Sequence, residues 1–215
     1  MNQLIKNWVV QMGGDETFPF IVIDNWYDPD TEKSVWKELD FLSCVDRANQ
    51  QRAENTVVAR TKDGESLSRS YRWYPFQIYN KEYGVPYSPI LNSVNNFRTP
   101  EFYEVMDKIK PQGRIWKSSN CDDTIISYYE NNDYYKPHWD KFLWTSLIWF
   151  YREPKQFTGG DFTLTERGYK IDLKHNRMFM FPCYSLHEVS PVKFKKLPKE
   201  MGFGRYTITH FWYSA

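Results

Sequence analysis

Residues 205–213, RYTITHFWY, are the last of six short apolar runs that recur along the second half of the chain. The runs are rich in β-branched and aromatic residues, and polar stretches containing Gly, Pro, Asn or Asp separate them. Short strands at such intervals are typical of an all-β sandwich or barrel. The other five runs are TIISYY (124–129), TSLIWFY (145–151), DFTL (161–164), RMFMFP (177–182) and HEVSPV (187–192).

The first half of the chain predicts elements that pack on this β core. The run FIVI at 20–23 is short and β-rich, so we expect a buried strand there. Asp28 before Pro29 is a helix-start signal, and apolar residues then recur at helical spacing. Thr99 before Pro100 predicts a second helix that reaches residue 109. The intervening residues 44–75 are polar and predict loops.

A Tyr- and Arg-rich segment, SLSRSYRWYPFQIYNKEYGV at 66–85, leaves two interpretations open. It is either a solvated loop with aromatic anchors or an irregular segment that faces a substrate. No linker divides the 215 residues, so we expect one domain at 1–215. Residues 1–113 would form a strand, supporting helices and a variable region, and residues 114–215 the β core.

Composition excludes several classes of protein. The net charge of +1 gives no broad electrostatic reason to bind nucleic acid or anionic membrane. No apolar run approaches the roughly 18 residues of a membrane helix, and the N-terminus lacks a secretory pattern. The three cysteines are far apart, which favours isolated reduced thiols. We therefore expect a soluble, cytoplasmic protein.

A candidate metal site lies in YYKPHWD at 134–140. In an extended segment, His138 and Asp140 point to the same face and can reach one ion. Such a pair also occurs by chance on surface loops. A later histidine, His187, completes a set of two imidazoles and one carboxylate, which is the facial triad of non-haem Fe(II) oxygenases. Of the other histidines, His175 lies in a polar turn, where we expect it to be solvated.

The last run offers a candidate anion site. By strand alternation Arg205, Thr207 and Thr209 share one face. A buried arginine needs a partner, which is either an acid of the protein or a small dicarboxylate held in a bidentate fork.

These motifs, taken in order over residues 124–213, resemble the 2-oxoglutarate- and Fe(II)-dependent oxygenases, in particular the prolyl 4-hydroxylase-like group. The resemblance rests on SYYENNDYYKPHWD, TGGDFTL, NRMFMFP, HEVSPV and RYTITHFWY. It implies a mainly β fold with a double-stranded β-helix (jelly-roll) core and supporting N-terminal helices. Residues 44–113 match nothing in that pattern.

The resemblance also implies roles for individual residues. His138, Asp140 and His187 would bind the iron, and no further catalytic residue is implied. Arg205 would bind the distal carboxylate of 2-oxoglutarate, with Tyr128 and Thr207 as further cosubstrate contacts. Candidates for substrate binding are Tyr134, Tyr135 and Trp73.

Two features depart from the family's pattern. Arg205 follows His187 by 18 residues, where about ten is usual, so KFKKLPKEMGFG (193–204) would be a longer hairpin that could touch substrate. Phe150 stands where some relatives carry a tyrosine close to the cosubstrate.

The implied activity is hydroxylation of a C–H bond, coupled to oxidative decarboxylation of 2-oxoglutarate to succinate and CO2. Fe(II) is the metal, 2-oxoglutarate and O2 are the cosubstrates, and ascorbate is a candidate reductant. A prolyl residue in a peptide or protein is the substrate that the resemblance favours. The alternatives are a free amino acid or small metabolite, or a non-catalytic β domain that binds a partner. Nucleic acid is disfavoured as a substrate by the charge balance.

Overall fold

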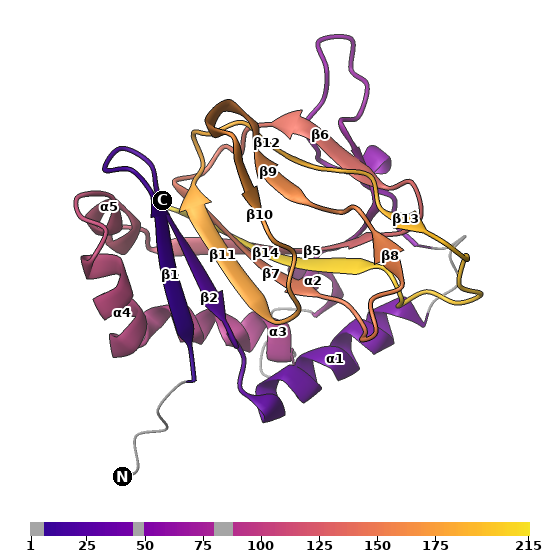
Figure 1. The fold of residues 1–215 in the computed structure, drawn as a ribbon, viewed down its shortest axis with the longest axis horizontal. Helices are drawn as coiled ribbons and strands as arrows, with labels where there is room; N and C mark the ends of the chain where they lie inside the picture. Colours follow the sequence, from indigo (N-terminus) through magenta and orange to yellow (C-terminus); the bar gives the residue numbers. More distant parts are fainter. Residues whose placement is uncertain (1–6, 45–49, 80–87) are drawn as a thin grey trace.

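Two antiparallel sheets face each other in the computed structural model, which describes residues 7–44, 50–79 and 88–215. The major sheet has the strand order β1-β2-β11-β7-β14-β5-β4, and the minor sheet the order β10-β9-β12-β6-β3 (Figure 1). This arrangement confirms the expected jelly-roll core. The major-sheet strands are β1 (Val9–Gly14), β2 (Pro19–Asp24), β4 (Tyr71–Trp73), β5 (Cys121–Tyr129), β7 (Trp144–Phe150), β11 (Arg177–Pro182) and β14 (Arg205–Tyr213).

The minor sheet carries shorter strands on the other side of the interior. They are β3 (Ser68–Arg69), β6 (Tyr134–His138), β9 (Phe162–Leu164), β10 (Tyr169–Ile171) and β12 (His187–Val189). Two further strands, β8 (Phe157–Thr158) and β13 (Lys193–Phe194), pair with each other. All six apolar runs identified in the sequence therefore lie in strands, although HEVSPV continues beyond β12.

The major sheet is buried on both faces, which explains why its strands read as nearly continuous apolar runs. One face packs on the helices through side chains such as Ile126, Ile148 and Ile208. The other face contributes Leu147 and Trp149 to a second cluster between the two sheets. This inner cluster is the interior of the jelly-roll.

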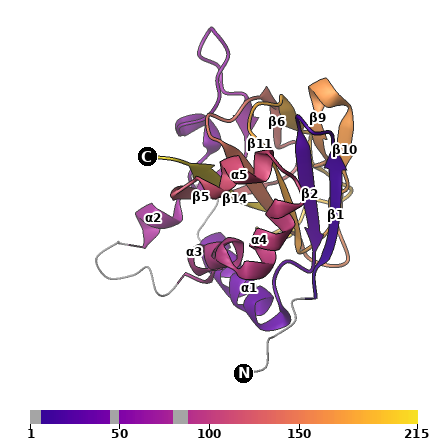
Figure 2. The same cartoon turned by 90° about the vertical axis from the view of Figure 1, so that its left-hand side faces the viewer.

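The helices cover the outer face of the major sheet, as the two views in Figures 1 and 2 agree. The Asp28 carboxylate caps the longest helix by accepting hydrogen bonds from the Asp30 and Thr31 amides, and Pro29 occupies its first turn. Within the described residues, no helix is long and apolar enough to cross a membrane. The helices are α1 (Pro29–Ser43), α2 (Pro75–Ile78), α3 (Pro89–Asn92), α4 (Pro100–Asp107) and α5 (Gln112–Lys117), with 3-10 turns η2 (Ala53–Asn55), η4 (Ser93–Arg98) and η5 (Thr165–Arg167).

The structure corrects the sequence-based boundaries at three places. Helix α5 occupies 112–117, so the β core begins at Cys121 and not at residue 114. Strand β1 has no strong apolar pattern because it is an exposed edge strand paired only with β2. The polar stretch 44–75 contains β3 and β4, whose short buried segments are held by pairing with strands far along the chain.

The described part of the segment 66–85 is not simply a solvated loop, since β4 is buried along its whole length. Residues 45–49 of the preceding polar stretch and 80–87, which include the end of this segment, lie outside the described residues. His175 is also less solvated than expected, because its Nε2 lies 2.9 Å from the Glu32 carboxylate and its ring stacks on Trp36.

Candidate metal centre

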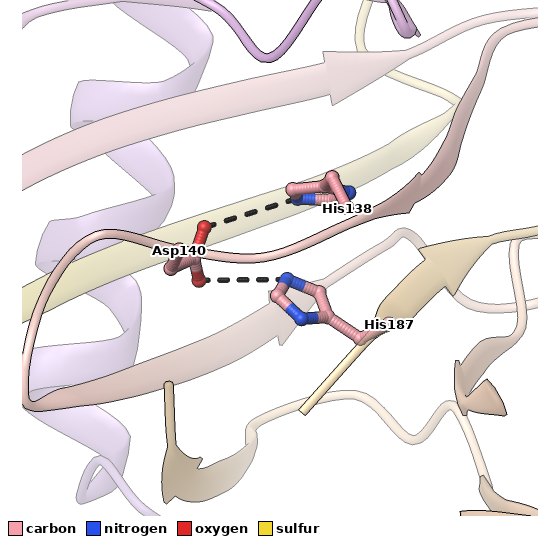
Figure 3. Close-up of side chains that lie close together, drawn as sticks. All are labelled: His138, Asp140 and His187. Carbon is pink, nitrogen blue, oxygen red and sulfur yellow. Dashed lines mark ion pairs between the residues drawn. The ribbon is translucent and has the colours of Figure 1, made fainter. Parts of the chain in front are cut away.

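Three side chains with metal-ligating atoms meet on the inner face of the minor sheet. They are His138, Asp140 and His187, and their ligand atoms all lie within 4.8 Å of one another (Figure 3). His138 Nε2 lies 3.8 Å from Asp140 Oδ1, and His187 Nε2 lies 3.4 Å from Asp140 Oδ2. The carboxylate faces both imidazoles and directs one oxygen toward each, as Figure 3 shows.

Strand pairing brings these residues together from positions far apart in the chain. His138 at the end of β6 lies directly opposite His187 at the start of β12. Asp140 follows two residues later, where the chain leaves the strand. The register between β6 and β12 shifts beyond this pair. Val189, two residues after His187, lies opposite Tyr135, three residues before His138, so β6 carries one extra residue at this point.

Hydrogen bonds orient both imidazoles for metal binding. His138 Nδ1 donates to the Lys136 carbonyl at 2.8 Å, and His187 Nδ1 donates to the Ser185 carbonyl at 3.0 Å. Because a carbonyl only accepts, these bonds assign the proton to Nδ1 and leave a lone pair on each Nε2. Burial is the main cause that lowers the pKa of His138 well below its ordinary value, and the electrostatic interaction with His187 lowers it further. The His138 ring is therefore neutral.

The carboxylate is oriented in the same way. Thr145 Oγ1 in β7 donates a 2.7 Å hydrogen bond to Asp140 Oδ2. Adjacent ligands on one face of an octahedron with bonds of about 2.1 Å are about 3 Å apart, close to the nitrogen–oxygen separations seen here. The donor set therefore fits a divalent ion of the Fe(II) type held on one face, with the remaining positions free for other ligands.

A buried guanidinium lies in the same interior. Arg205 is fully buried, and its Nη1 donates to Thr207 Oγ1 at 2.6 Å. Its Nε and Nη2 have no hydrogen-bond partner in the described part of the chain. Burial lowers the pKa of Arg205 to about 10, so it stays charged at neutral pH. Two free N–H groups on one guanidinium are the donors that a carboxylate accepts in a bidentate fork.

Aromatic side chains connect the arginine and the triad across the interior. The Arg205 guanidinium carbon lies 5.8 Å from the Trp149 ring centroid, and Trp149 contacts Phe162. The Phe162 ring in turn stacks on His187 at 5.4 Å. A small dicarboxylate bound at the metal would thus share one interior with the arginine.

A sequence comparison finds a family model that matches the part of the chain holding this site. Residues 124–213 match the sequence profile of the 2OG-Fe(II) oxygenase superfamily. Over these residues, which include His138, Asp140, His187 and Arg205, the chain is similar to that superfamily. The family implies Fe(II) and 2-oxoglutarate as metal and cosubstrate, and the three metal-ligating side chains and the unpaired Arg205 fit both. Comparison with curated protein sequences gives no match.

Solved structures of 2OG-Fe(II) oxygenases share the fold. A Pseudomonas putida prolyl-4-hydroxylase superposes with a TM-score of 0.55 at 12% identity, covering 91% of this chain and 92% of its own. An oxidoreductase of the 2OG-Fe(II) oxygenase family from Burkholderia pseudomallei gives 0.53 at 12% identity, covering 90% and 84%. The non-heme alpha-ketoglutarate-dependent epimerase SnoN from nogalamycin biosynthesis gives 0.50 at 9% identity, covering 89% and 76%.

Tyr128 does not face the oxygenase interior, contrary to the prediction. It pairs with Tyr206 and lies on the helix side of β5, where its hydroxyl accepts hydrogen bonds from the Gly202 and Gly204 amides. The next residue, Tyr129, points inward, and the Arg205 guanidinium carbon lies 4.9 Å from its ring centroid. Strand alternation therefore moves the candidate cosubstrate contact by one residue.

The same alternation directs Phe150 to the helix side of the major sheet, away from Arg205. It packs against Trp36 and Tyr27 on the helix side, while its neighbour Trp149 faces Arg205. The side chain at 150 is therefore not positioned to touch a cosubstrate bound at Arg205.

Only one of the three candidates for substrate binding lies beside the triad. The Tyr135 ring stacks on His138 with centroids 3.5 Å apart. Tyr134 alternates to the outer face of β6, where the Lys136 ammonium lies over its ring. Trp73 is buried on the helix side of β4, and its Nε1 donates to Gln50 Oε1 at 2.7 Å, so it does not face the interior.

Three inward-facing side chains escaped the sequence analysis: Thr145, Tyr129 and Arg72. Each is placed by strand register and not by a local motif. Tyr129 lies opposite Arg205 in the neighbouring strand, so the pairing of β5 with β14 would have identified it. Thr145 lies five residues after Asp140, but only the fold reveals that its hydroxyl reaches the carboxylate.

Proposed function

We propose that this chain is an Fe(II)- and 2-oxoglutarate-dependent hydroxylase. In this proposal His138, Asp140 and His187 bind the iron, and Arg205 binds the distal carboxylate of 2-oxoglutarate. The observation that carries it is the combination of an oriented His–Asp–His triad with a buried arginine in the same interior, two of whose N–H groups have no partner within the described ranges. A purely structural arginine would be expected to pair with an acid of the protein.

Bound iron and 2-oxoglutarate would supply the oxidising chemistry, in which one O2 converts C–H to C–OH and 2-oxoglutarate to succinate and CO2. The chain supplies geometry. Lys136 and Ser185 carbonyls hold the imidazole tautomers, and Thr145 holds Asp140. Thr207 accepts from Arg205, which leaves the hydroxyl hydrogen of Thr207 able to point to a carboxylate.

The aromatic interior serves the same chemistry. Trp149 and Phe162 are almost completely buried between the sheets. An apolar surrounding excludes water, which strengthens the electrostatic contacts inside and limits side reactions of an oxidising centre.

The proposed domain is the whole of residues 1–215. Strand β2, from the N-terminal part, pairs with β11, and β4 pairs with β5 of the catalytic core. Because these strands extend the same sheet, the N-terminal part and the core are proposed to form one oxygenase domain.

For the substrate, the proposal is a prolyl residue in a peptide or protein. The fold likeness to the P. putida prolyl-4-hydroxylase supports this choice. Tyr74 and Gln77 of the Tyr- and Arg-rich segment also line a surface hollow of about 580 Å³, together with Gln51 and Val57. Such a hollow could receive part of an extended chain.

A screen of proline-containing peptides and small metabolites tests the proposal. The protein is incubated with Fe(II), 2-oxoglutarate, O2 and ascorbate, and mass spectrometry detects products that gain one oxygen atom. The proposal expects a peptide product that requires both iron and 2-oxoglutarate. Oxidation of a free amino acid or metabolite, with all peptides left unchanged, would reject the prolyl-peptide substrate but keep the hydroxylase.

A further inference from the structure

Arg72 is a second buried arginine of the interior, and the proposed function gives it no role. It is the central residue of β4 and lies opposite Ser127 of β5, which in turn lies opposite Thr207 of β14. Its neighbours Tyr71 and Trp73 point to the helix side, so alternation directs Arg72 inward. Its side chain is on the same face of the major sheet as Arg205.

The contacts of Arg72 include no carboxylate in the described part of the chain. Its Nη1 donates to the Val57 carbonyl at 3.2 Å, and its guanidinium carbon lies 5.4 Å from the Tyr135 ring centroid. The residue is only 6% exposed, and its Nε has no hydrogen-bond partner among the residues that the structure describes. Arg52, by contrast, pairs with the buried Asp133 at 2.9 Å.

A buried cation without an anion destabilises the folded protein, because desolvation of its charge is not offset. The guanidinium also offers planar donors suited to a carboxylate, and burial makes that match stronger than at the surface. An arginine kept in this state is therefore best explained by an anion that binds from outside the protein.

The position of Arg72 assigns that anion to the substrate region. Tyr135 lies between Arg72 and the triad, since its ring stacks on His138 at 3.5 Å. The guanidinium carbon lies 5.4 Å from the Tyr135 centroid, which lies 3.5 Å from the His138 centroid, so the carbon is within about 9 Å of the His138 ring. Arg72 lies near enough to the metal centre to hold a molecule that reacts there.

We propose that Arg72 binds a carboxylate of the substrate, so that the substrate is an acidic peptide or a free acid. The inference rests on the proposed function, because the iron and 2-oxoglutarate define where the substrate sits. The carboxylate comes from one of two sources: the α-carboxylate of a terminal or free residue, or an acidic side chain next to the reacting residue.

Matched ligands test this without turnover, in protein loaded with Mn(II) and 2-oxoglutarate. The first pair is N-acetyl-L-proline and N-acetyl-L-prolinamide, which differ at the α-carboxylate. The second pair is two capped proline peptides with Asp or Asn beside the proline. Calorimetry measures the dissociation constant of each ligand for the wild type, Arg72→Gln and Arg72→Lys.

The expected result is that at least one acidic ligand binds the wild type about tenfold or more tightly than its amide, as one charge-assisted hydrogen bond provides. The pair that discriminates identifies the source of the carboxylate. Arg72→Gln should reduce this ratio to about one, and Arg72→Lys should retain part of it. The affinity for 2-oxoglutarate should stay within about twofold of the wild type, which also reports that the variants fold.

Arg69→Gln is the control, because it removes the same charge from a half-exposed side chain on strand β3, which precedes β4 in the chain. It should leave the discrimination intact. Failure of both acidic ligands to outbind their amides in the wild type would overturn the inference, as would discrimination that persists in Arg72→Gln. A loss of 2-oxoglutarate binding in Arg72→Gln would instead assign Arg72 to the cosubstrate and overturn it too. Absence of 2-oxoglutarate binding in the wild type would refute the proposed function itself.

Discussion

Replacing Arg205 by Gln should weaken 2-oxoglutarate binding without destabilising the protein. Two N–H groups of the guanidinium, on Nε and Nη2, have no partner in the part of the chain that the structure describes, and each can donate to one oxygen of a carboxylate. A hydrogen bond to a charged group contributes about 1.5–3 kcal/mol, so the pair contributes about 3–6 kcal/mol. The dissociation constant for 2-oxoglutarate should therefore rise by a factor of about 10² to 10⁴.

Calorimetric titration of the Mn(II)-loaded protein with 2-oxoglutarate measures this change without turnover. Thr207→Val is the matched comparison, since it removes one hydroxyl from the same site and should cause a smaller loss. The midpoint temperature of thermal unfolding of the ligand-free Arg205→Gln variant should be at least as high as that of the wild type, because the substitution removes a buried charge that has no acid partner among the described residues. A folded variant with unchanged affinity for 2-oxoglutarate would refute the assignment of Arg205.

Three further predictions follow from single contacts. Thr145→Val should lower Fe(II) affinity about 10- to 100-fold in a chelator competition, because Asp140 loses its 2.7 Å hydrogen bond, whereas Thr209→Val should not. Gly160→Ala should weaken 2-oxoglutarate binding, because a Cβ there would lie 2.9 Å from Arg205 Cδ; Gly168→Ala, at a similar positive φ but in open space, should not. Burial lowers the pKa of His210 to about 3, so metal-free protein should lose stability as the pH falls below about 6.5 towards 3, and His210→Asn should flatten that dependence in urea unfolding.

Local sequence patterns were sufficient for the six apolar strands of the core and for the cluster of His138, Asp140 and His187, but not for the short strands β8 and β10, which lie in the polar stretches between the runs. His138 and Asp140 are two residues apart, and His187 starts an apolar run, so their shared site follows from strand periodicity and residue chemistry. The start of α1 could also be predicted from the sequence, because the capping residue Asp28 and the following Pro29 are adjacent in the chain.

Features that depend on long-range register were less accessible. Tyr128 and Tyr129 are adjacent tyrosines, and only their pairing with Tyr206 and Arg205 decides which one faces the interior. The inward direction of Arg72 depends on pairing with a strand more than fifty residues later in the chain. Helix α5 is short and its local sequence carries weak signals, so tertiary packing of Trp116 determines it.

The most direct test of the proposed metal centre is iron-dependent release of CO2 from 2-oxoglutarate. The test measures the slow decarboxylation of 2-oxoglutarate that is expected without a hydroxylated substrate, so it requires no knowledge of the substrate. Wild-type protein should release CO2 and succinate only when Fe(II) is present. His187→Ala should abolish this release while its circular dichroism and thermal unfolding stay close to those of the metal-free wild type. Equal release by wild type and His187→Ala, or no iron-dependent release by the wild type, would contradict the role of the His138–Asp140–His187 triad.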